Sequence, residues 1–163
     1  MLTLRHATAD DVPQILAFIA ELAEYEREPQ AATATAEDLL RDGFGDDPRF
    51  FVEIAEWDGE PAGFAFWFLN YSTWSGRAGV YLEDIFVRPA FRRRGIGVAL
   101  MEHLGRLCAE RGYTRLVLQV LDWNTPAIAF YESLGARPMS EWITMRIKGE
   151  ALAALGSGRP TPG

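Results

Sequence analysis

Three arginines stand together at residues 92–94, and Gly95 and Gly97 follow them directly. Glycine lets a backbone approach a ligand closely, and free N–H groups at the start of a helix point towards an anion. Arginine adds charge-assisted hydrogen bonds to phosphate oxygens. The stretch is therefore a candidate phosphate cradle. Two other interpretations compete with it: a basic nucleic-acid patch, or a plain turn whose arginines lie in solvent.

The charge of the chain and the form of the loop narrow this choice. The 163 residues carry a formal net charge of -7, which argues against a nucleic-acid binder and favours small or cationic partners. No Gly-Lys-Ser/Thr follows the glycines, so the loop is not a Walker loop. The third glycine of a dinucleotide fingerprint is also missing. Two interpretations of the loop remain: a pyrophosphate site in a fold other than those two, and the plain turn.

A pair of carboxylates, Glu83 and Asp84, interrupts the apolar strand pattern "VYLEDIFV". Side chains alternate along a strand, so we expect Glu83 to share a face with Ile85 and Asp84 to share the opposite face with Leu82. A buried carboxylate must be paired or functional, because an unpaired buried charge is costly. The alternative to a functional pair is a structural ion pair with a nearby arginine, Arg77 or Arg88.

Cysteine and histidine are too few for several kinds of site. One cysteine, Cys108, excludes an internal disulfide and fits the reducing cytoplasm. His6 and His103 add only two further ligands, so we expect no zinc cluster and no metal. No stretch reaches the roughly 18 apolar residues of a membrane span, and we expect no membrane partner.

The elements that must position these residues can be predicted from spacing and turn residues. Strands are expected at 2–7, 49–57, 62–71, 76–89, 114–123 and 142–148, with Asp58-Gly59 as a hairpin turn. Helices are expected at 8–26, at 35–45 behind a Thr35–Asp38 capping pair, and from about Gly97 to Arg111. A short helix at 124–136 would take Thr125 as its N-cap, Pro126 at its first position and Gly135 as its stop. Antiparallel hairpins that lead into one strand–helix–strand unit predict an α/β fold with a mixed sheet.

Residues 92–97, "RRRGIG", resemble the Arg/Gln-x-x-Gly-x-Gly/Ala pyrophosphate loop of the GNAT family of N-acetyltransferases, and "NTPAIAFYESLGA" resembles a later helix of that family. Five further stretches resemble its diamine acetyltransferase branch, which comprises spermidine/spermine and thialysine N-acetyltransferases. They are "AELAEYE", "EDLLRDGFG", "YSTWSG", "YLEDIFV" and "LDWN". The resemblance runs from Leu2 to Lys148. It implies a mostly antiparallel mixed sheet flanked by helices, with a coenzyme A-binding strand–loop–helix at its centre.

The resemblance assigns the phosphate interpretation to the loop and acetyl-CoA as the co-substrate. It implies coenzyme contacts along one strand end, the loop and the start of the later helix. These are Ile85, Phe86, Val87, Arg92, Arg93, Arg94, Gly95, Ile96, Gly97, Val98, Asn124, Thr125, Pro126, Ala127 and Tyr131. It places the amine acceptor at Tyr25, Glu26, Glu83, Asp84, Val117, Leu118 and Gln119.

Two of these residues are expected to carry the proton transfers. An alkyl ammonium titrates near 10.4, so the site must remove a proton, and we assign that role, through water, to Glu83. Tyr131, with a phenol pKa near 10, is suited to protonate the departing thiolate. From its helix alone, Tyr131 could equally be a core aromatic, and the resemblance decides for the acid.

The acceptor and the assembly are less closely defined. "ARPMSEW" lacks the acidic run that the polyamine enzymes carry at this place, and "LDWN" is closer to the thialysine-type members. The acceptor is thus expected to be a polyamine, a diamine or a lysine-like amino acid. A protein-lysine acetyltransferase and a non-catalytic acetyl-CoA sensor are the rival functions. We expect one domain over 1–148, a helical turn and flexible tail over 149–163, a homodimer and a cytoplasmic location.

Overall fold

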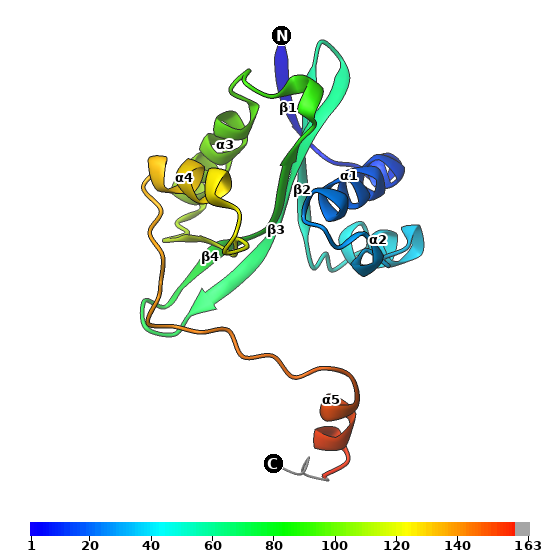
Figure 1. The fold of residues 1–163 in the computed structure, drawn as a ribbon, viewed down its shortest axis with the longest axis vertical. Helices are drawn as coiled ribbons and strands as arrows, with labels where there is room; N and C mark the ends of the chain where they lie inside the picture. The colour runs from blue at the N-terminus through cyan, green and yellow to red at the C-terminus, as the bar shows by residue number, and fades with distance from the viewer. Residues whose placement is uncertain (159–163) are drawn as a thin grey trace. The chain divides into compact units, whose positions relative to one another are not determined.

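A computed structural model of the chain describes residues 1–158, which form two compact units, Met1–Leu121 and a second that begins at Asp122. Figure 1 shows the elements of each unit. The first unit contains β1 (Leu2–His6), α1 (Val12–Tyr25), α2 (Ala36–Gly43), β2 (Phe51–Trp57), β3 (Glu60–Ser72), β4 (Arg77–Val87), α3 (Ile96–Arg111) and β5 (Leu116–Leu118). The second contains α4 (Thr125–Ser133) and α5 (Gly149–Gly156).

The first unit is built on a five-stranded sheet in the order β1-β2-β3-β4-β5. The first three pairings are antiparallel, and β4 pairs with β5 in parallel. Short turns join β2 to β3 and β3 to β4, whereas α1 and α2 lie between β1 and β2 in the chain. The parallel pairing requires a crossover connection, which α3 supplies. The predicted mixed, mostly antiparallel sheet is confirmed.

Helices cover both faces of this sheet, as Figure 1 shows, with α1 and α2 on one face and α3 on the other. On the first face, the rings of Phe18 and Phe64 stack with centroids 5.1 Å apart. On the second face, Leu100 and Leu104 of α3 and Trp67 of β3 belong to one buried cluster. The glycine loop therefore precedes a helix, α3, whose position on the sheet is fixed by apolar burial.

A predicted helix cap and a predicted hairpin turn both form in the structure. Thr35 and Asp38 make a reciprocal capping box at the start of α2, with bonds of 2.9 and 3.2 Å. Asp58 and Gly59 both have positive φ, the conformation that a two-residue turn between β2 and β3 requires.

Three predicted elements differ. No strand forms over 142–148 among the described residues. The alternating apolar pattern there specifies a strand-like side-chain order, but a strand also needs a neighbouring backbone to pair with, and no pairing involves this segment. β5 is limited to Leu116–Leu118, where its pairing with β4 ends, and 119–123 continue outside the sheet.

The third difference is the start of α4. Asn124, not Thr125, is the N-cap, because the Asn124 side-chain oxygen accepts a bond from the Ala127 N–H at 3.3 Å. Gly135 adopts the expected left-handed conformation just after the helix. The predicted flexible tail lies largely in 159–163, outside the described residues, and the single domain over 1–148 stays a prediction. Within 1–158 no helix has the length and apolarity to cross a membrane.

Candidate active site

The glycine loop connects β4 to α3 through backbone conformations that expose helix N–H groups. Arg93 and Gly95 have positive φ values of 63° and 75°, and α3 begins at Ile96. The first bond of the helix runs from the Ala99 N–H to the Gly95 oxygen at 2.9 Å. The N–H groups of the first helical turn, up to Val98, therefore have no intrahelical acceptor. This is the geometry of an anion site at a helix start.

Two of the three arginines of the loop lie on aromatic rings. The Arg92 guanidinium lies 5.4 Å from the ring centroid of Tyr25, and its Nε–H donates to the Val87 carbonyl at 3.1 Å. The Arg94 guanidinium lies 4.9 Å from the ring of Trp57. Stacking fixes a guanidinium and leaves its edge N–H groups able to donate to phosphate.

The end of β4 has one neighbouring strand instead of two. Its pairing with β5 stops at Leu82 opposite Leu118, whereas β4 continues to Val87 beside β3. Ile85 and Phe86 thus have one backbone edge that faces away from β3, and no strand of the described residues pairs with that edge. Such an edge can bind an extended ligand through main-chain hydrogen bonds.

A β-bulge places the two carboxylates of β4. Phe66 of β3 pairs with Asp84, and the next residue, Trp67, pairs with Leu82, so Glu83 is the extra residue. A bulge shifts the alternation of side chains and is common beside active sites. Leu82 and Ile85 consequently belong to the same cluster under α3. The expected alternation, with Leu82 and Ile85 on opposite faces, is wrong because it assumed a regular strand.

The bulge gathers acidic side chains from two elements. Burial, and then the negative charge of Glu83, raises the pKa of Glu26, which caps the C-terminal end of α1. Burial, followed by the charges of Glu83 and Glu26, raises the pKa of Asp84 to about 7. Burial and Glu83 also raise the pKa of Tyr81. Glu26, Glu83 and Asp84, called here the acidic cluster, therefore lie close enough to interact.

Among residues 1–158 no arginine forms an ion pair with the acidic cluster. Within the described residues neither Glu83 nor Asp84 makes an ion pair, and Arg88 binds Glu21 at 2.9 and 3.0 Å and the Pro61 carbonyl at 3.0 Å. The alternative of a structural ion pair with Arg77 or Arg88 is therefore wrong. Carboxylates that repel one another and lack a countercharge favour a cationic ligand.

The remaining predicted acceptor residues adjoin this cluster along β5 and α1. Val117 and Leu118 pair with Tyr81 and Leu82 of β4, and Gln119 follows directly. Tyr25 lies under Arg92, so one side chain of the loop contacts the helix end that carries Glu26.

Five predicted residues lie in the second unit and are described there alone. Asn124, Thr125, Pro126 and Ala127 form the N-cap and first turn of α4. Tyr131 lies on the same helix, with its ring centroid 5.3 Å from that of Phe130.

Two features of this site were not predicted from the sequence. The Arg92–Tyr25 contact joins residues far apart in the chain, and no local pattern indicates it. The bulge had one signal in the sequence. In a regular strand one of two adjacent carboxylates would face the apolar core, so the Glu83-Asp84 pair indicates an irregularity. Among residues 1–158 no group of three or more His, Cys, Asp or Glu side chains could hold a metal ion.

Comparison with known proteins gives matches along nearly the whole chain. The family model described as the acetyltransferase (GNAT) family matches residues 14–136. A thialysine N-epsilon-acetyltransferase of Sus scrofa is 39% identical over an alignment of 163 positions, which covers 93% of this chain and 95% of that protein. A human spermidine/spermine N(1)-acetyltransferase-like protein 1 is 37% identical over 91% of this chain and 23% of its own length.

Solved structures share the same architecture. An integron cassette protein from the mobile metagenome of V. cholerae superposes with a TM-score of 0.80 at 24% identity, covering 95% of this chain and 97% of its own. At this identity the match establishes the fold alone.

Proposed function

Because the chain belongs to the acetyltransferase (GNAT) family and is an acetyl-CoA-dependent acetyltransferase, we propose that it acetylates a primary amine of a small cationic substrate. The observation that carries this proposal is the acidic cluster. Its carboxylates have no countercharge among the described residues, and Arg92 on Tyr25 joins them to the glycine loop.

The loop and the free edge of β4 fit acetyl-CoA, which supplies the acetyl group as a thioester. The helix-start N–H groups at 96–98 and the edges of Arg92, Arg93 and Arg94 would hold the pyrophosphate. The backbone of 85–87 would bind the pantetheine arm, and N–H groups there would polarise the thioester carbonyl. Residues 124–127 are expected beside the coenzyme.

The acidic cluster would both bind the substrate ammonium and take its proton. Glu83 is the exposed member and is assigned to deprotonation through a water molecule, so that the neutral amine attacks the thioester directly. Asp84 is a second candidate, because a carboxylate whose pKa lies near 7 is matched to proton transfer at neutral pH. Tyr25, Glu26 and residues 117–119 would complete the acceptor site.

Tyr131 is assigned as the general acid. The thiolate that leaves the acetyl group needs a proton, and a phenol is a sufficiently weak acid to remain protonated until that moment. The hydroxyl of Tyr131 would supply this proton as the carbon–sulfur bond breaks.

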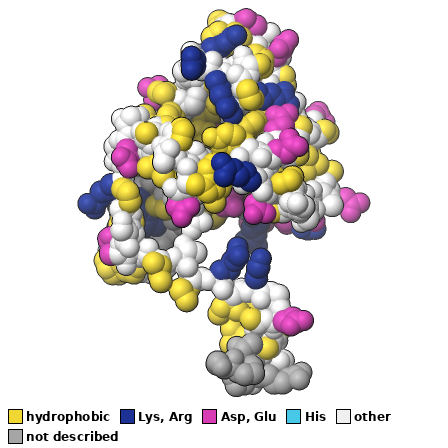
Figure 2. All heavy atoms as spheres, in the orientation of Figure 1, with side chains coloured by type: hydrophobic (Ala, Val, Ile, Leu, Met, Phe, Trp, Pro, Cys, Tyr) yellow, Lys and Arg dark blue, Asp and Glu magenta, His cyan; other side chains and the backbone are white. Residues whose placement is uncertain are grey.

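The relatives narrow the acceptor to small amines. Their names refer to thialysine and to spermidine or spermine, so we propose a polyamine, a diamine or a thialysine-like amino acid. We also propose a homodimer in the cytoplasm, with no nucleic-acid or membrane partner. Figure 2 shows basic and acidic side chains mixed over the face in view, which agrees with a small-molecule substrate.

An amine panel with acetyl-CoA tests this function. Purified protein is assayed with spermidine, putrescine, thialysine, lysine and a lysine peptide, and free coenzyme A is followed as product. Acetylation of at least one small amine, with the peptide a poorer substrate, is the expected result. Preference for the peptide would assign a protein-lysine acetyltransferase, and coenzyme binding with no acetylated product would assign a sensor.

A further inference from the structure

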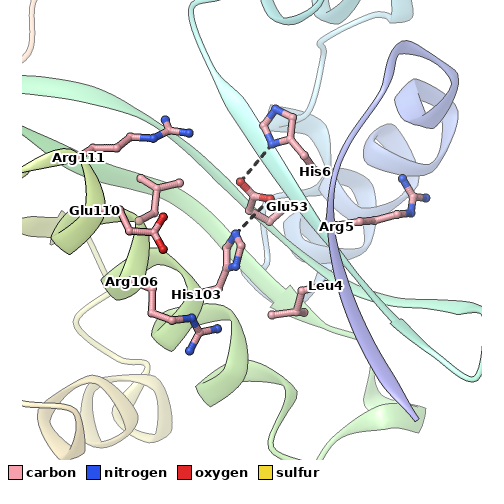
Figure 3. Close-up of a pocket in the computed structure, with 9 residues that line it drawn as sticks. Leu4, Arg5, His6, Glu53, His103, Arg106, Glu110 and Arg111 are labelled. Carbon is pink, nitrogen blue, oxygen red and sulfur yellow. Dashed lines mark hydrogen bonds and ion pairs between the residues drawn. The ribbon is translucent and has the colours of Figure 1, made fainter.

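A pocket in the first unit shares no residue with the acetyl-transfer site. It has a volume of about 350 Å³ and opens between β1, β2 and α3 (Figure 3). Ligand pockets in proteins range from roughly 300 to 1,000 Å³, so this one suits a small molecule. Nothing in the proposed acetyl transfer uses its residues.

The floor of the pocket is a buried carboxylate, Glu53, which is 3% exposed. One of its oxygens lies 3.2 Å from Nδ1 of His6 and 3.3 Å from the indole nitrogen of Trp67. The other lies 3.5 Å from Nε2 of His103. Burial of a carboxylate is costly unless it is paired. Glu53 therefore binds an imidazole at each oxygen, as Figure 3 shows.

The two histidines can change the charge of the pocket. A ring nitrogen that donates to Glu53 leaves the opposite nitrogen as an acceptor when the ring is neutral and as a donor when it is protonated. The hydrogen bond to Glu53 raises the pKa of His6, against burial and the nearby charge of Arg111. His6 has a side chain 60% exposed, so a ligand can reach it.

The rim of the pocket comes from one face of α3. His103, Arg106 and Glu110 line it at the three- and four-residue spacing of a helical stripe, and Arg111 follows Glu110 directly. Within the described residues neither Arg106 nor Arg111 makes an ion pair. Arg5 also lines the pocket, but its guanidinium is bound by Asp11 and Glu56 at 2.8 Å and points away in Figure 3.

These groups set the net charge of the pocket. Arg106 and Arg111 balance Glu53 and Glu110, so the pocket is neutral when both histidines are neutral. It carries two positive charges when both are protonated. Arg111 then faces the His6 imidazolium, and an anion placed between them would remove that repulsion.

We propose that this pocket is a proton-linked binding site for a small oxyanion, a phosphate or a carboxylate, held by Arg106, Arg111 and the two protonated histidines. Glu53 is the internal countercharge that holds both imidazoles in place, and it does not contact the ligand. Binding favours the protonated histidines, so the affinity falls as the pH rises, by up to about tenfold per pH unit for each proton taken up.

Histidine NMR tests the proposal directly, because His6 and His103 are the only histidines of the chain. Ring nitrogen signals are followed from pH 5 to pH 9 with inorganic phosphate, with succinate, and with sodium chloride at matched ionic strength. Saturating coenzyme A is present throughout, to keep phosphate off the glycine loop. We expect phosphate or succinate to raise both histidine pKa values relative to chloride, and the stronger effect identifies the preferred anion.

Variants of the rim separate a built site from general ionic effects. Arg106→Gln and Arg111→Gln should each weaken the anion affinity by about tenfold or more at pH 6, the loss expected for one charge-assisted contact. Arg49→Gln, an exposed arginine outside the pocket, is the matched control and should change nothing. Equal histidine pKa values in all three salts, or unchanged anion affinity in both rim variants, would overturn the proposal.

Discussion

At the scale of single residues, the raised pKa of Asp84 leads to a prediction about the stability of the fold. Its pKa is about 7 in the folded protein and 3.8 ordinarily, so the folded state holds the proton more tightly than the unfolded chain. Ionisation therefore favours unfolding, and Asp84 reduces stability progressively as the pH rises from 3.8 to about 7. We expect Asp84→Asn to be the more stable protein at pH 8, by on the order of a few kcal/mol.

Urea unfolding of both proteins between pH 5 and pH 8 measures this difference. The stability gap between Asp84→Asn and wild type should widen as the pH rises. Asp46→Asn, an exposed carboxylate outside the acidic cluster, should show no such widening. A pH-independent gap for Asp84→Asn would mean that Asp84 is ionised throughout this range.

Tyr131 provides the second prediction at this scale, on the chemical step. Tyr131→Phe removes one oxygen and keeps the ring, so the packing against Phe130 is preserved. If the hydroxyl protonates the thiolate, acetyl transfer should slow by roughly a hundredfold or more. Acetyl-CoA affinity should change much less, because the pyrophosphate and the pantetheine arm are held by other residues.

Single-turnover acetylation at saturating amine is the appropriate measurement, because slow product release would hide a change in the chemical step. Phe130→Leu, which alters the neighbouring ring and keeps the hydroxyl, controls for packing. A near-wild-type rate for Tyr131→Phe, with folding intact, would remove Tyr131 from the mechanism.

At the scale of elements, the two ends of α3 offer a matched pair of glycines. Gly95 precedes the helix with φ of 75° and Gly112 follows it with φ of 73°, and a Cβ would meet nothing within 4 Å at either position. Valine should destabilise the protein by about 1–2 kcal/mol at each position, the usual left-handed penalty. Only Gly95→Val should also weaken coenzyme binding, because only Gly95 shapes the loop.

Isothermal titration of coenzyme A into the two variants checks this prediction. We expect the dissociation constant to rise by about tenfold or more for Gly95→Val, with Gly112→Val close to wild type. Equal affinities in the two variants would mean that the loop glycines only turn the chain.

The same scale shows what the sequence could and could not predict. Elements with local causes formed as expected: Asp58 and Gly59 turn β2 into β3, and Thr35 begins α2. Features that depend on distant backbone did not follow from local pattern. The segment 142–148 alternates like a strand but pairs with nothing among the described residues.

The candidate site, too, could be predicted only in part. The types of its residues were predictable, because carboxylates in an apolar strand and arginines before glycines are unusual in themselves. Their orientation was not predictable, since the bulge at Glu83 depends on the register of β3 against β4. The Glu53–His6–His103 group was also out of reach, because β1, β2 and α3 must first assemble to bring these residues together.

At the scale of the whole molecule, exposed aromatic side chains support a homodimer. Tyr71 is 65% exposed near the end of β3, and Trp74 is 90% exposed in the turn that follows. Burial of such rings between two chains is a common source of association energy. Sedimentation equilibrium at micromolar concentration should give twice the chain mass, and Trp74→Ser should shift the population towards monomer. A wild-type monomer at that concentration contradicts the expectation.

The net charge of -7 gives the last prediction, on the salt dependence of acetylation. An acidic protein attracts a polycation over a range that salt shortens, with a Debye length of about 10 Å at 0.1 M. The kcat/KM value for spermidine should therefore fall by several-fold between 50 and 300 mM sodium chloride. The value for thialysine should fall less, because its own carboxylate offsets part of the attraction. Glu26→Gln removes one charge of the acidic cluster and should flatten the spermidine slope, whereas Glu26→Asp keeps the charge and should retain it. If both variants keep the wild-type slope, the attraction does not come from the cluster, and Glu26 has no part in recruiting the amine.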